Sequence, residues 1–481
     1  MGVSLNPSTI LSGQGIDVSS LVQQIISEQS GQLSVWQGEQ TTLATQNGLL
    51  EGINNNLTNL QSAVAALADP AGALTAQAAT SSQPGIVTAT ASSSAVSGTH
   101  QIVVASLATA GTLYSNPVTG GANTSFLANG QTSGDVQLLV GGTTRDIAIT
   151  AGSNDTLTTL ASYINTQSTT NGWGVTASVV SDGSGSRLSL QSQSSGTGGA
   201  LAIGGNSNTS LTFDAPVGGT NAAFTIDGVP FSSSSNTVTG AIQGVTLNLL
   251  SQSAGTPVQL TVGPDTSQIT NAVNNFVSAY NTLVSTINTQ YVVDPTGSVP
   301  APPLESDISL RSLQSRILAD ASYAIGGNSG FVNLASLGIN TNNDGTLSIG
   351  TNASGQTFAQ VVAANPSAVQ SFFQNSSGTG FANNFNTDLT ALTDPTQGPL
   401  YVDLTQNQAE QSDLTTTINN FETQLTTEQT QLTQQYDAVN ASLQSYPLLL
   451  QEVTETLGTL GSSTSSSGAT ASAGPTLTSG L

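Results

Sequence analysis

The sequence contains no cysteine and no lysine, and its 481 residues include only four arginines and one histidine. Without cysteine the chain can form neither a disulfide framework nor a catalytic thiolate. Without lysine it cannot build a phosphate-binding P-loop, and one histidine cannot complete a Cys/His zinc site. These absences predict a chain that holds no cofactor and no metal.

Positive charge is scarce, since 27 acidic residues against four cations give a formal net charge of −23. Affinity for nucleic acid grows with the number of lysines and arginines that neutralise phosphates, so a nucleic-acid partner is excluded. Acidic membrane surfaces are disfavoured for the same reason. Aromatic residues make up only 5% of the chain, which allows modest hydrophobic cores but not one large core.

Long apolar runs are also missing. No stretch approaches the ~18 consecutive apolar residues that a membrane-spanning helix needs, so we expect no membrane insertion. Residues 1–16 contain no lysine, no arginine and no apolar run, which does not fit a cleaved secretory signal. We expect a protein that either stays in the cytosol or leaves the cell by a route that cleaves no signal.

Catalytic and metal-binding motifs are also incomplete in this sequence, because residues that they require are missing. A Ser-His-Asp triad would have to use His100, which follows Gly98-Thr99 at the start of a predicted strand. The string from Asn340 to Gly345 resembles the start of an EF-hand loop, but position twelve of that loop is Thr351, where a bidentate glutamate is required. A hairpin turn is the better interpretation, and the sequence predicts that the chain is not an enzyme.

The sequence does contain two regions in which apolar residues recur every seven positions. Near the N-terminus these residues are Trp36, Leu43, Leu50, Leu57 and Val64 in one row, and Ile53, Leu60 and Leu67 in a second. Near the C-terminus they are Ile418, Leu425, Leu432, Val439 and Tyr446 in one row, and Leu414, Phe421, Tyr436 and Leu443 in a second. Sustained spacing of this kind is typical of coiled-coil helices.

The spacing predicts one helix over about 33–68, ended by Asp69-Pro70, and one over about 404–446, which Pro447 ends or kinks. Neither helix can bury its rows alone. We therefore predict that the two pack as an antiparallel pair or bundle, the alternative being two separate helices on a globular core. Because polar Glu428 and Gln435 interrupt the C-terminal rows, we expect these helices to mediate oligomerisation.

Between the two helices the pattern is mostly that of β-strands separated by turns. Strands are predicted at 86–91, 101–106, 135–140, 145–150, 175–180, 187–191, 223–226, 245–250 and 258–262. A short helix capped by Asp155 falls among them, and a hairpin turns at Asp182-Gly183. Two stretches rich in glycine, 115–134 and 196–219, are interpreted as an inter-domain linker and as the closing segment of an α+β unit.

Helical spacing is found at four further places. A short helix follows Gly15, with Asp17 or Ser19 as its cap, and Asp265 with Gln268 has the spacing of a capping box before another. Helices are also predicted over about 306–324 and 357–374, with a hairpin at 337–349 between them. The first fifteen and the last twenty residues have the composition of disordered segments.

These elements predict a multidomain α+β fold in which β-rich head domains are inserted into a base of terminal coiled-coil helices and a helical bundle. The predicted domains are nested and discontinuous. They are the terminal regions 1–35 with 430–481, a helical leg domain 36–72 with 265–429, a β-rich head domain 73–114 with 215–264, and an outer α+β head domain 115–214.

Several segments of the chain resemble the flagellar hook-associated protein 2 family. Gly15-Ile-Asp-Val-Ser-Ser-Leu-Val and Gly98-Thr-His-Gln-Ile-Val-Val resemble its N-terminal region, and the unit at 135–203 resembles the motif shared by flagellins and hook-associated proteins. Ile226-Asp-Gly-Val, Leu337-Gly-Ile and Asn365-Pro, followed by the final heptads, resemble its C-terminal region. The segments cover nearly the whole chain in the order of the family.

The resemblance implies that several copies form a ring-like plate that caps the flagellar filament, with the terminal helices as legs and the β-rich middle as the plate. Flagellin would fold and insert beneath the plate. The implied partners are further copies of the chain, flagellin, the hook–filament junction proteins, and the flagellar type III export apparatus with its chaperone. The implied location is extracellular, at the filament tip.

The low charge departs from what intersubunit salt bridges would need, so we expect apolar and amide contacts between copies instead. Two alternatives stay open at this point. One is another flagellar axial protein, such as a junction protein or a flagellin-like subunit. The other is an adhesin in which residues 115–214 bind host glycans through exposed aromatic residues such as Trp173, although Trp173 also fits a core position at the start of a strand.

Overall fold

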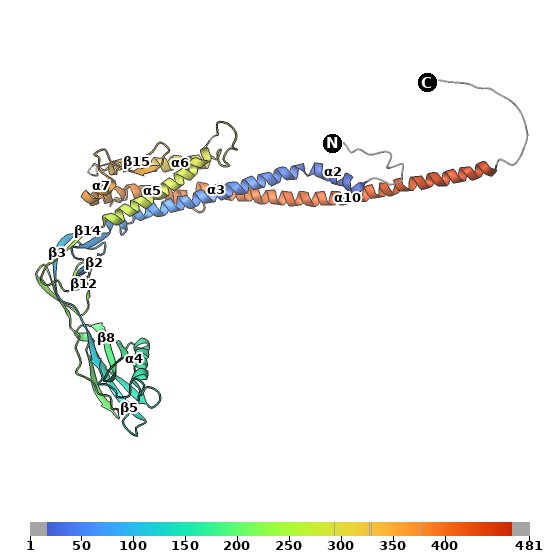
Figure 1. Cartoon of the computed structure of the whole chain (residues 1–481). Coiled ribbons are helices and arrows are strands. Elements are labelled where there is room, and N and C mark those ends of the chain that lie inside the picture. Colours follow the sequence, from blue (N-terminus) through green and yellow to red (C-terminus); the bar gives the residue numbers. More distant parts are fainter. Residues whose placement is uncertain (1–16, 293, 327, 329, 376, 464–481) are drawn as a thin grey trace, which may run out of the picture. The chain divides into compact units, whose positions relative to one another are not determined.

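The computed structural model describes residues 17–463 apart from positions 293, 327, 329 and 376. Figure 1 shows its helices and strands, with colours that follow the sequence. The disorder predicted for the first fifteen residues lies outside the described residues. So does that predicted for the last twenty, except at Ser462 and Ser463, where the prediction is wrong because they belong to a helix. The chain forms two compact units. The first contains residues 1–58, 282–317 and 389–481, and the second contains 59–281 and 318–388. The four-domain division follows other boundaries and stays a prediction.

The N-terminal helices of the first unit lie where the spacing predicts them. Helix α2 (Val18–Gln29) begins where the Asp17 carboxylate accepts a hydrogen bond of 3.1 Å from the backbone N–H of Ser20, so Asp17 is its cap. After a break at Ser30, helix α3 covers Gly31–Ala68 and ends immediately before Asp69-Pro70. Both predicted helices are confirmed.

The C-terminal helix α10 covers Pro399–Ser463 and is longer than predicted at both ends. The expectation that Pro447 could end it is wrong, because the helix continues through this residue. Proline removes one backbone donor and crowds the carbonyl four residues earlier, which costs about 3 kcal/mol at that turn. Leu448, Leu449 and Leu450 follow at once and favour helix, so the loss stays local.

Three further helices, α5 (Thr266–Asn288), α6 (Ile308–Ala321) and α9 (Phe381–Leu392), each contribute residues to both units. The predicted cap of α5 is confirmed, since the Asp265 carboxylate accepts a hydrogen bond of 3.0 Å from the backbone N–H of Gln268. Between α5 and α6 lies the short 3₁₀ helix η3 (Thr289–Tyr291).

The helix predicted over 357–374 is two helices, α7 (Phe358–Ala364) and α8 (Pro366–Phe373). The prediction fails because Pro366 forces Asn365 out of the helical region, to φ −139° and ψ 55°. Helix α9 was not predicted, although Phe381, Phe385 and Leu389 recur at intervals of four. The rings of Phe372 and Phe381 stack at 5.4 Å, which joins α8 and α9 in the core of the second unit.

The predicted hairpin at 337–349 is present as β15 (Ile339–Thr341) and β16 (Leu347–Ile349), after a 3₁₀ turn η4 (Leu334–Leu337). Its turn uses Gly345 at φ +81°, where glycine is favoured. The Asp344 carboxylate accepts hydrogen bonds from the N–H and the hydroxyl of Thr346. The acidic side chain of the EF-hand-like string therefore stabilises the turn itself.

Two antiparallel sheets of the second unit share one core and form what we call the β sandwich. One sheet has the order β1 (Gln77–Ser81), β14 (Val258–Pro264), β3 (Gly98–Ser106), β10 (Ala222–Ile226) and β11 (Val229–Ser233), and a short 3₁₀ helix η1 (Ala73–Thr75) precedes it. The other has the order β12 (Thr237–Ile242), β13 (Val245–Leu249) and β2 (Val87–Ala91). Strands after residue 220 thus return to the sheets begun before residue 107, as predicted.

A second core belongs to what we call the outer module, also within the second unit. One of its sheets has the order β4 (Ala110–Tyr114), β8 (Gly185–Ser195) and β7 (Val175–Asp182). The other has the order β6 (Thr143–Thr150), β5 (Ser133–Val140) and β9 (Leu201–Ser207). Helix α4 (Leu157–Asn171) packs with both sheets in one hydrophobic cluster, and η2 (Thr197–Gly199) follows β8.

Four details of the outer module differ from the sequence predictions. Residues 115–134 are not a linker, because Phe126 is fully buried in the core of the module. The cap of α4 is Thr156, which forms a capping box with Thr159, and not Asp155. The β7–β8 turn lies one residue later, since Asp182 pairs with Gly185. Strand β9 lies inside the glycine-rich stretch, where Gly204 leaves room for the side chain of Leu139.

Candidate assembly surface on the terminal helices

Helices α2 and α3 pack antiparallel against α10 inside the first unit (Figure 1). The Gln29 side-chain amide donates to the Glu428 carboxylate at 2.9 Å, and that of Gln40 donates to the Thr415 hydroxyl at 2.7 Å. Because residue numbers rise on one side as they fall on the other, the pairing is antiparallel. The predicted antiparallel pair is confirmed, and the alternative of two separate helices is wrong.

One aromatic contact anchors this pair. The rings of Trp36 and Phe421 lie 5.3 Å apart at 86°, an edge-to-face arrangement that adds about 0.5–1.5 kcal/mol to the burial of the two rings. The polar gap in the C-terminal rows has a structural role, since Glu428 accepts its hydrogen bond from Gln29, the last residue of α2. Apolar rows and neutral amides hold the pair together.

The predicted residues of α3 are covered by the chain itself. Trp36 is half-buried, Leu43 is 7% exposed, and the others have no exposed surface, namely Leu50, Ile53, Leu57, Leu60, Val64 and Leu67. Side chains enclosed in this way stabilise the fold of one copy. The role of these buried side chains in oligomerisation stays a prediction, and it would be indirect, since they hold α3 in place within one copy.

The exposed fraction of the predicted α10 residues is highest toward the C-terminal end of the helix. Ile418 and Leu425 are 7% exposed, and an intermediate group consists of Leu414, Phe421, Leu432, Tyr436 and Leu443. Val439 is 49% exposed and Tyr446 is 60% exposed. The enclosure of α10 therefore ends near the residues that face the start of α2.

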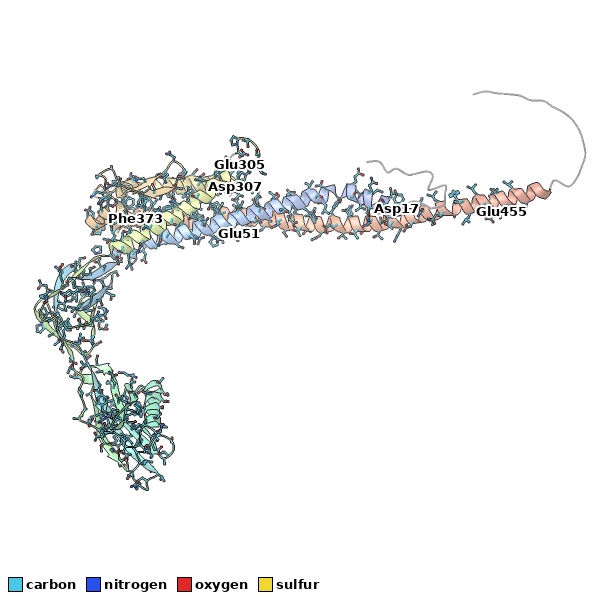
Figure 2. The ribbon with its side chains drawn as sticks, in the orientation of Figure 1. Asp17, Glu51, Glu305, Asp307, Phe373 and Glu455 are labelled. Atoms are coloured by element: carbon cyan, nitrogen blue, oxygen red, sulfur yellow. The ribbon has the colours of Figure 1, made fainter. Side chains whose placement is uncertain are left out.

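Beyond that point α10 presents exposed apolar side chains that we call the C-terminal apolar row. It consists of Val439, Tyr446, Leu448, Leu449, Leu450, Val453 and Leu457, each about half to two-thirds exposed. Figures 1 and 2 show this end of α10, which includes Glu455, running past α2 with no other described element of the first unit beside it. Contiguous exposed apolar surface of this kind is a candidate site of contact with another molecule.

The heptad rows predict Val439 and Tyr446 but not the rest of this row, because the predicted helix ends or kinks at Pro447. The signal was present in the sequence. Tyr446, Leu450, Val453 and Leu457 follow one another at intervals of four, three and four, which continues the heptad spacing.

His100, the single histidine, takes part in a turn contact. Its Nδ1 lies 2.7 Å from Asp227 Oδ2, while Asp227 Oδ1 accepts a hydrogen bond of 2.8 Å from the N–H of Gln101. The Gln101 N–H, and then His100, hold the pKa of Asp227 below its ordinary value. The three residues fasten the β10–β11 turn to β3.

Other sites that the sequence raised lack the geometry they would need. Trp173 is 9% exposed and packs edge-to-face on Tyr163, with ring centres 6.2 Å apart, so it offers no aromatic platform for a glycan. Within the described residues, no three His, Cys, Asp or Glu side chains gather as a metal site. In the same part of the chain, no helix is long and apolar enough to cross a membrane.

The sequence matches three family models in the order of the chain. Residues 14–111 match the N-terminus of flagellar hook-associated protein 2, residues 135–194 match the flagellin hook IN motif, and residues 219–446 match the C-terminus of flagellar hook-associated protein 2. The B-type flagellar hook-associated protein 2 of Pseudomonas aeruginosa is 31% identical over 354 residues, which are 68% of this chain and 73% of that protein. The chain belongs to the flagellar hook-associated protein 2 family.

Two more proteins of this kind are similar to the chain. The flagellar hook-associated protein 2 of Campylobacter jejuni is 34% identical over 170 residues, which are 32% of this chain and 25% of that protein. The crystal structure of the flagellar cap protein FliD D1-D2-D3 domains from Escherichia coli has a TM-score of 0.56 and 25% identity, and the alignment covers 75% of this chain and 99% of that one. The multidomain α+β fold is that of the family, whose role is structural, as the cap of the flagellar filament.

Proposed function

We propose that this chain caps the distal tip of the flagellar filament as a homo-oligomer, and that the cap promotes the folding and insertion of exported flagellin and prevents its loss. The protein acts outside the cell after export through the flagellar type III apparatus. Its partners are further copies of itself, flagellin, the hook–filament junction proteins and an export chaperone. Family membership and the likeness to the cap protein of Escherichia coli support this proposal.

The observation that carries the assembly step is the C-terminal apolar row. Full burial of one large apolar side chain contributes about 1.5–3 kcal/mol, so a row of seven exposed residues is a strong driving force for association. Five of its residues keep the heptad spacing that coiled coils use, namely Val439, Tyr446, Leu450, Val453 and Leu457. A second copy of the chain presents the same row, and symmetric assemblies of one chain are the commonest oligomers.

The contacts between copies are expected to be apolar and amide in character. The chain has four arginines and no lysine, and the helix pair within one copy is already joined by the amides of Gln29 and Gln40. Salt screens ion pairs but not apolar contacts. Association between copies should therefore weaken little as sodium chloride is added, and a steep loss would contradict this part of the proposal.

The cap function is tested in cells that lack the protein. We expect missing or very short filaments by electron microscopy and monomeric flagellin in the culture medium, with both defects repaired by the full chain. A chain truncated after residue 429 should fail to repair them. Filaments of normal length in cells without the protein would contradict the cap function.

A further inference from the structure

Two segments of the chain join the β sandwich to the outer module, and they run antiparallel to each other. Residues 109–112 enter the module and 217–221 leave it. The Thr109 N–H donates to the Thr220 carbonyl at 2.9 Å, and Thr112 and Val217 exchange two backbone hydrogen bonds of 2.9 Å. Two paired strands alone form a ribbon that can still bend and twist.

A third segment, residues 194–199 at the end of β8 and in η2, fastens this ribbon from the side of the outer module. The Ser195 hydroxyl donates to the Ser234 carbonyl at 2.6 Å, and the Thr197 N–H donates to the Asn221 side-chain carbonyl at 3.0 Å. Asn221 and Ser234 immediately flank strands β10 and β11 of the sandwich. We call residues 109–112, 194–199 and 217–221 the neck.

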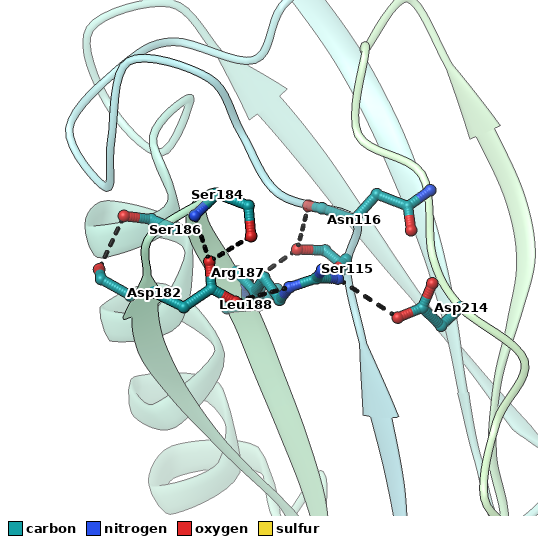
Figure 3. A network of polar contacts seen from close by, with 9 residues as sticks. Ser115, Asn116, Asp182, Ser184, Ser186, Arg187, Leu188 and Asp214 are labelled. Carbon is teal, nitrogen blue, oxygen red and sulfur yellow. Dashed lines mark hydrogen bonds and ion pairs between the residues drawn. The ribbon is translucent and has the colours of Figure 1, made fainter.

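One arginine clamps both strands where they reach the outer module (Figure 3). A terminal nitrogen of Arg187 donates to the Ser115 carbonyl at 3.3 Å and lies 3.4 Å from the Asp214 carboxylate. The buried Ser115 hydroxyl accepts a hydrogen bond of 2.8 Å from the Leu188 N–H and donates to the Asn116 carbonyl. The entering and leaving strands are therefore tied to β8 as well as to each other.

Glycines bring the three segments of the neck into direct backbone contact. A Cβ added at Gly219 would lie 2.7 Å from the Thr109 carbonyl oxygen and closer still to that of Gly196. A Cβ added at Gly196 would lie 2.6 Å from the Ser234 Cα, and Gly196 also has a φ of +79°. Real Cβ atoms do not approach other atoms this closely, so only glycine fits at these positions.

The neighbouring glycines behave differently. An added Cβ at Gly218 or at Gly198 would meet no atom within 4 Å, and neither residue has a positive φ. The same dipeptide, Gly218-Gly219, thus holds one open glycine and one that is enclosed by backbone. The glycine-rich stretch, interpreted from the sequence as the closing segment of the α+β unit, is here packed tightly against backbone at Gly219.

We propose that the neck is a rigid coupling that fixes the outer module on the β sandwich, so that the two move as one body. Hydrogen bonds join the third segment, residues 194–199, to both sides of the ribbon and to the sandwich, and these added bonds restrict the bending and twisting that a two-stranded ribbon allows. The coupling is a property of a single copy and does not depend on the proposed assembly. We therefore expect that any rotation or translation of the sandwich moves the outer module by the same rotation or translation.

The absence of cysteine makes this proposal directly measurable in the full chain. The variant Val96→Cys/Val180→Cys carries one spin label on an exposed site of the sandwich and one on an exposed site of the outer module. Pulsed electron paramagnetic resonance should give a narrow distance distribution. Adding Gly219→Ala should broaden it about twofold, since the module then samples several orientations, whereas the matched control Gly218→Ala should leave it unchanged.

Three results would overturn the proposal. They are a distribution that is already broad without Gly219→Ala, one that Gly219→Ala leaves narrow in a folded protein, and equal broadening by Gly218→Ala. If circular dichroism shows that Gly219→Ala does not fold, Asn221→Ala takes its place as the test of the coupling. This variant removes the acceptor for the Thr197 N–H without adding bulk, so it should broaden the distribution, and an unchanged distribution counts against the coupling.

Discussion

Helices α3 and α10 carry the same heptad spacing but differ in what becomes of it. On α3 every predicted leucine, isoleucine and valine is buried within the chain, whereas on α10 the enclosure ends near Val439 and the row continues exposed to Leu457. Seven-residue spacing specifies that a helix has an apolar face, but it does not specify which molecule covers that face. The two helices therefore differ in exposure, since the apolar face of α3 is buried in the fold and that at the end of α10 is exposed.

The largest expected effect separates these two roles. Leu57→Ala removes a side chain with no exposed surface from α3 and should lower the free energy of unfolding by about 2–5 kcal/mol, because a cavity remains. Leu450→Ala on the exposed row should change it by less than about 0.5 kcal/mol. Urea denaturation followed by circular dichroism measures both. Equal losses in the two variants would remove the distinction between the helices.

The second effect concerns Pro447, which α10 contains and which has no counterpart in α3. Pro447→Ala restores a backbone donor and should stabilise the turn around residue 447 by up to about 3 kcal/mol. Hydrogen exchange should show slower exchange at residues 443–451, with global unfolding unchanged, because this part of α10 makes few contacts within the chain. Unchanged exchange would mean that the proline does not limit the local stability of α10.

A smaller effect tests the contact that joins the two helices. In a double-mutant cycle, Trp36→Leu and Phe421→Leu should show a coupling free energy of about 1 kcal/mol, as expected for an edge-to-face aromatic pair. Thermal or urea unfolding of the four proteins gives this value. Phe421→Leu combined with Leu432→Ala offers a control on the same helix, and coupling of equal size there would mean that the ring contact has no special weight.

The smallest effect lies in the loop between α5 and α6, away from both rows. Hydrogen bonds from the Thr296 hydroxyl and N–H, and from the N–H of Val299, lower the pKa of Asp294 to about 2. Because the folded pKa lies below the ordinary value of 3.8, the stabilisation is complete above that value and is lost as the pH falls toward 2. Carboxyl titration by nuclear magnetic resonance should show this midpoint, and Thr296→Val should raise it. A midpoint near 3.8 in the unchanged chain would contradict the turn geometry.

The spacing of apolar residues was sufficient to predict those parts of the fold that follow one regular pattern. The two long helices, their antiparallel pairing, most strands and the Asn343-Asp344-Gly345 turn follow from apolar spacing and turn chemistry. Composition was a poor guide where packing decides. Phe126 is buried, which makes the predicted linker 115–134 part of a core, and composition does not show that Gly219 is enclosed by backbone while Gly218 is not.

The candidate surface was predictable only in part, because Pro447 has two possible consequences. A proline can end a helix or lie inside one, and the outcome depends on whether the turns beyond it are stable enough to absorb the loss of one hydrogen bond. The leucines at 448–450 supply that stability here. Their exposure could not be foreseen, since it depends on where α2 begins relative to α10.

The most direct test of the central claim is the oligomeric state of the full chain, measured by sedimentation velocity. The variant Leu450→Asn/Val453→Asn/Leu457→Asn replaces half-exposed apolar side chains of the row, and Gln451→Asn/Thr456→Asn is the control on the same helix turns. We predict that the unchanged chain and the control form the same oligomer, and that the row variant is monomeric with an unchanged thermal unfolding midpoint. A row variant that assembles as the unchanged chain does would contradict the assignment of the C-terminal apolar row as the assembly surface.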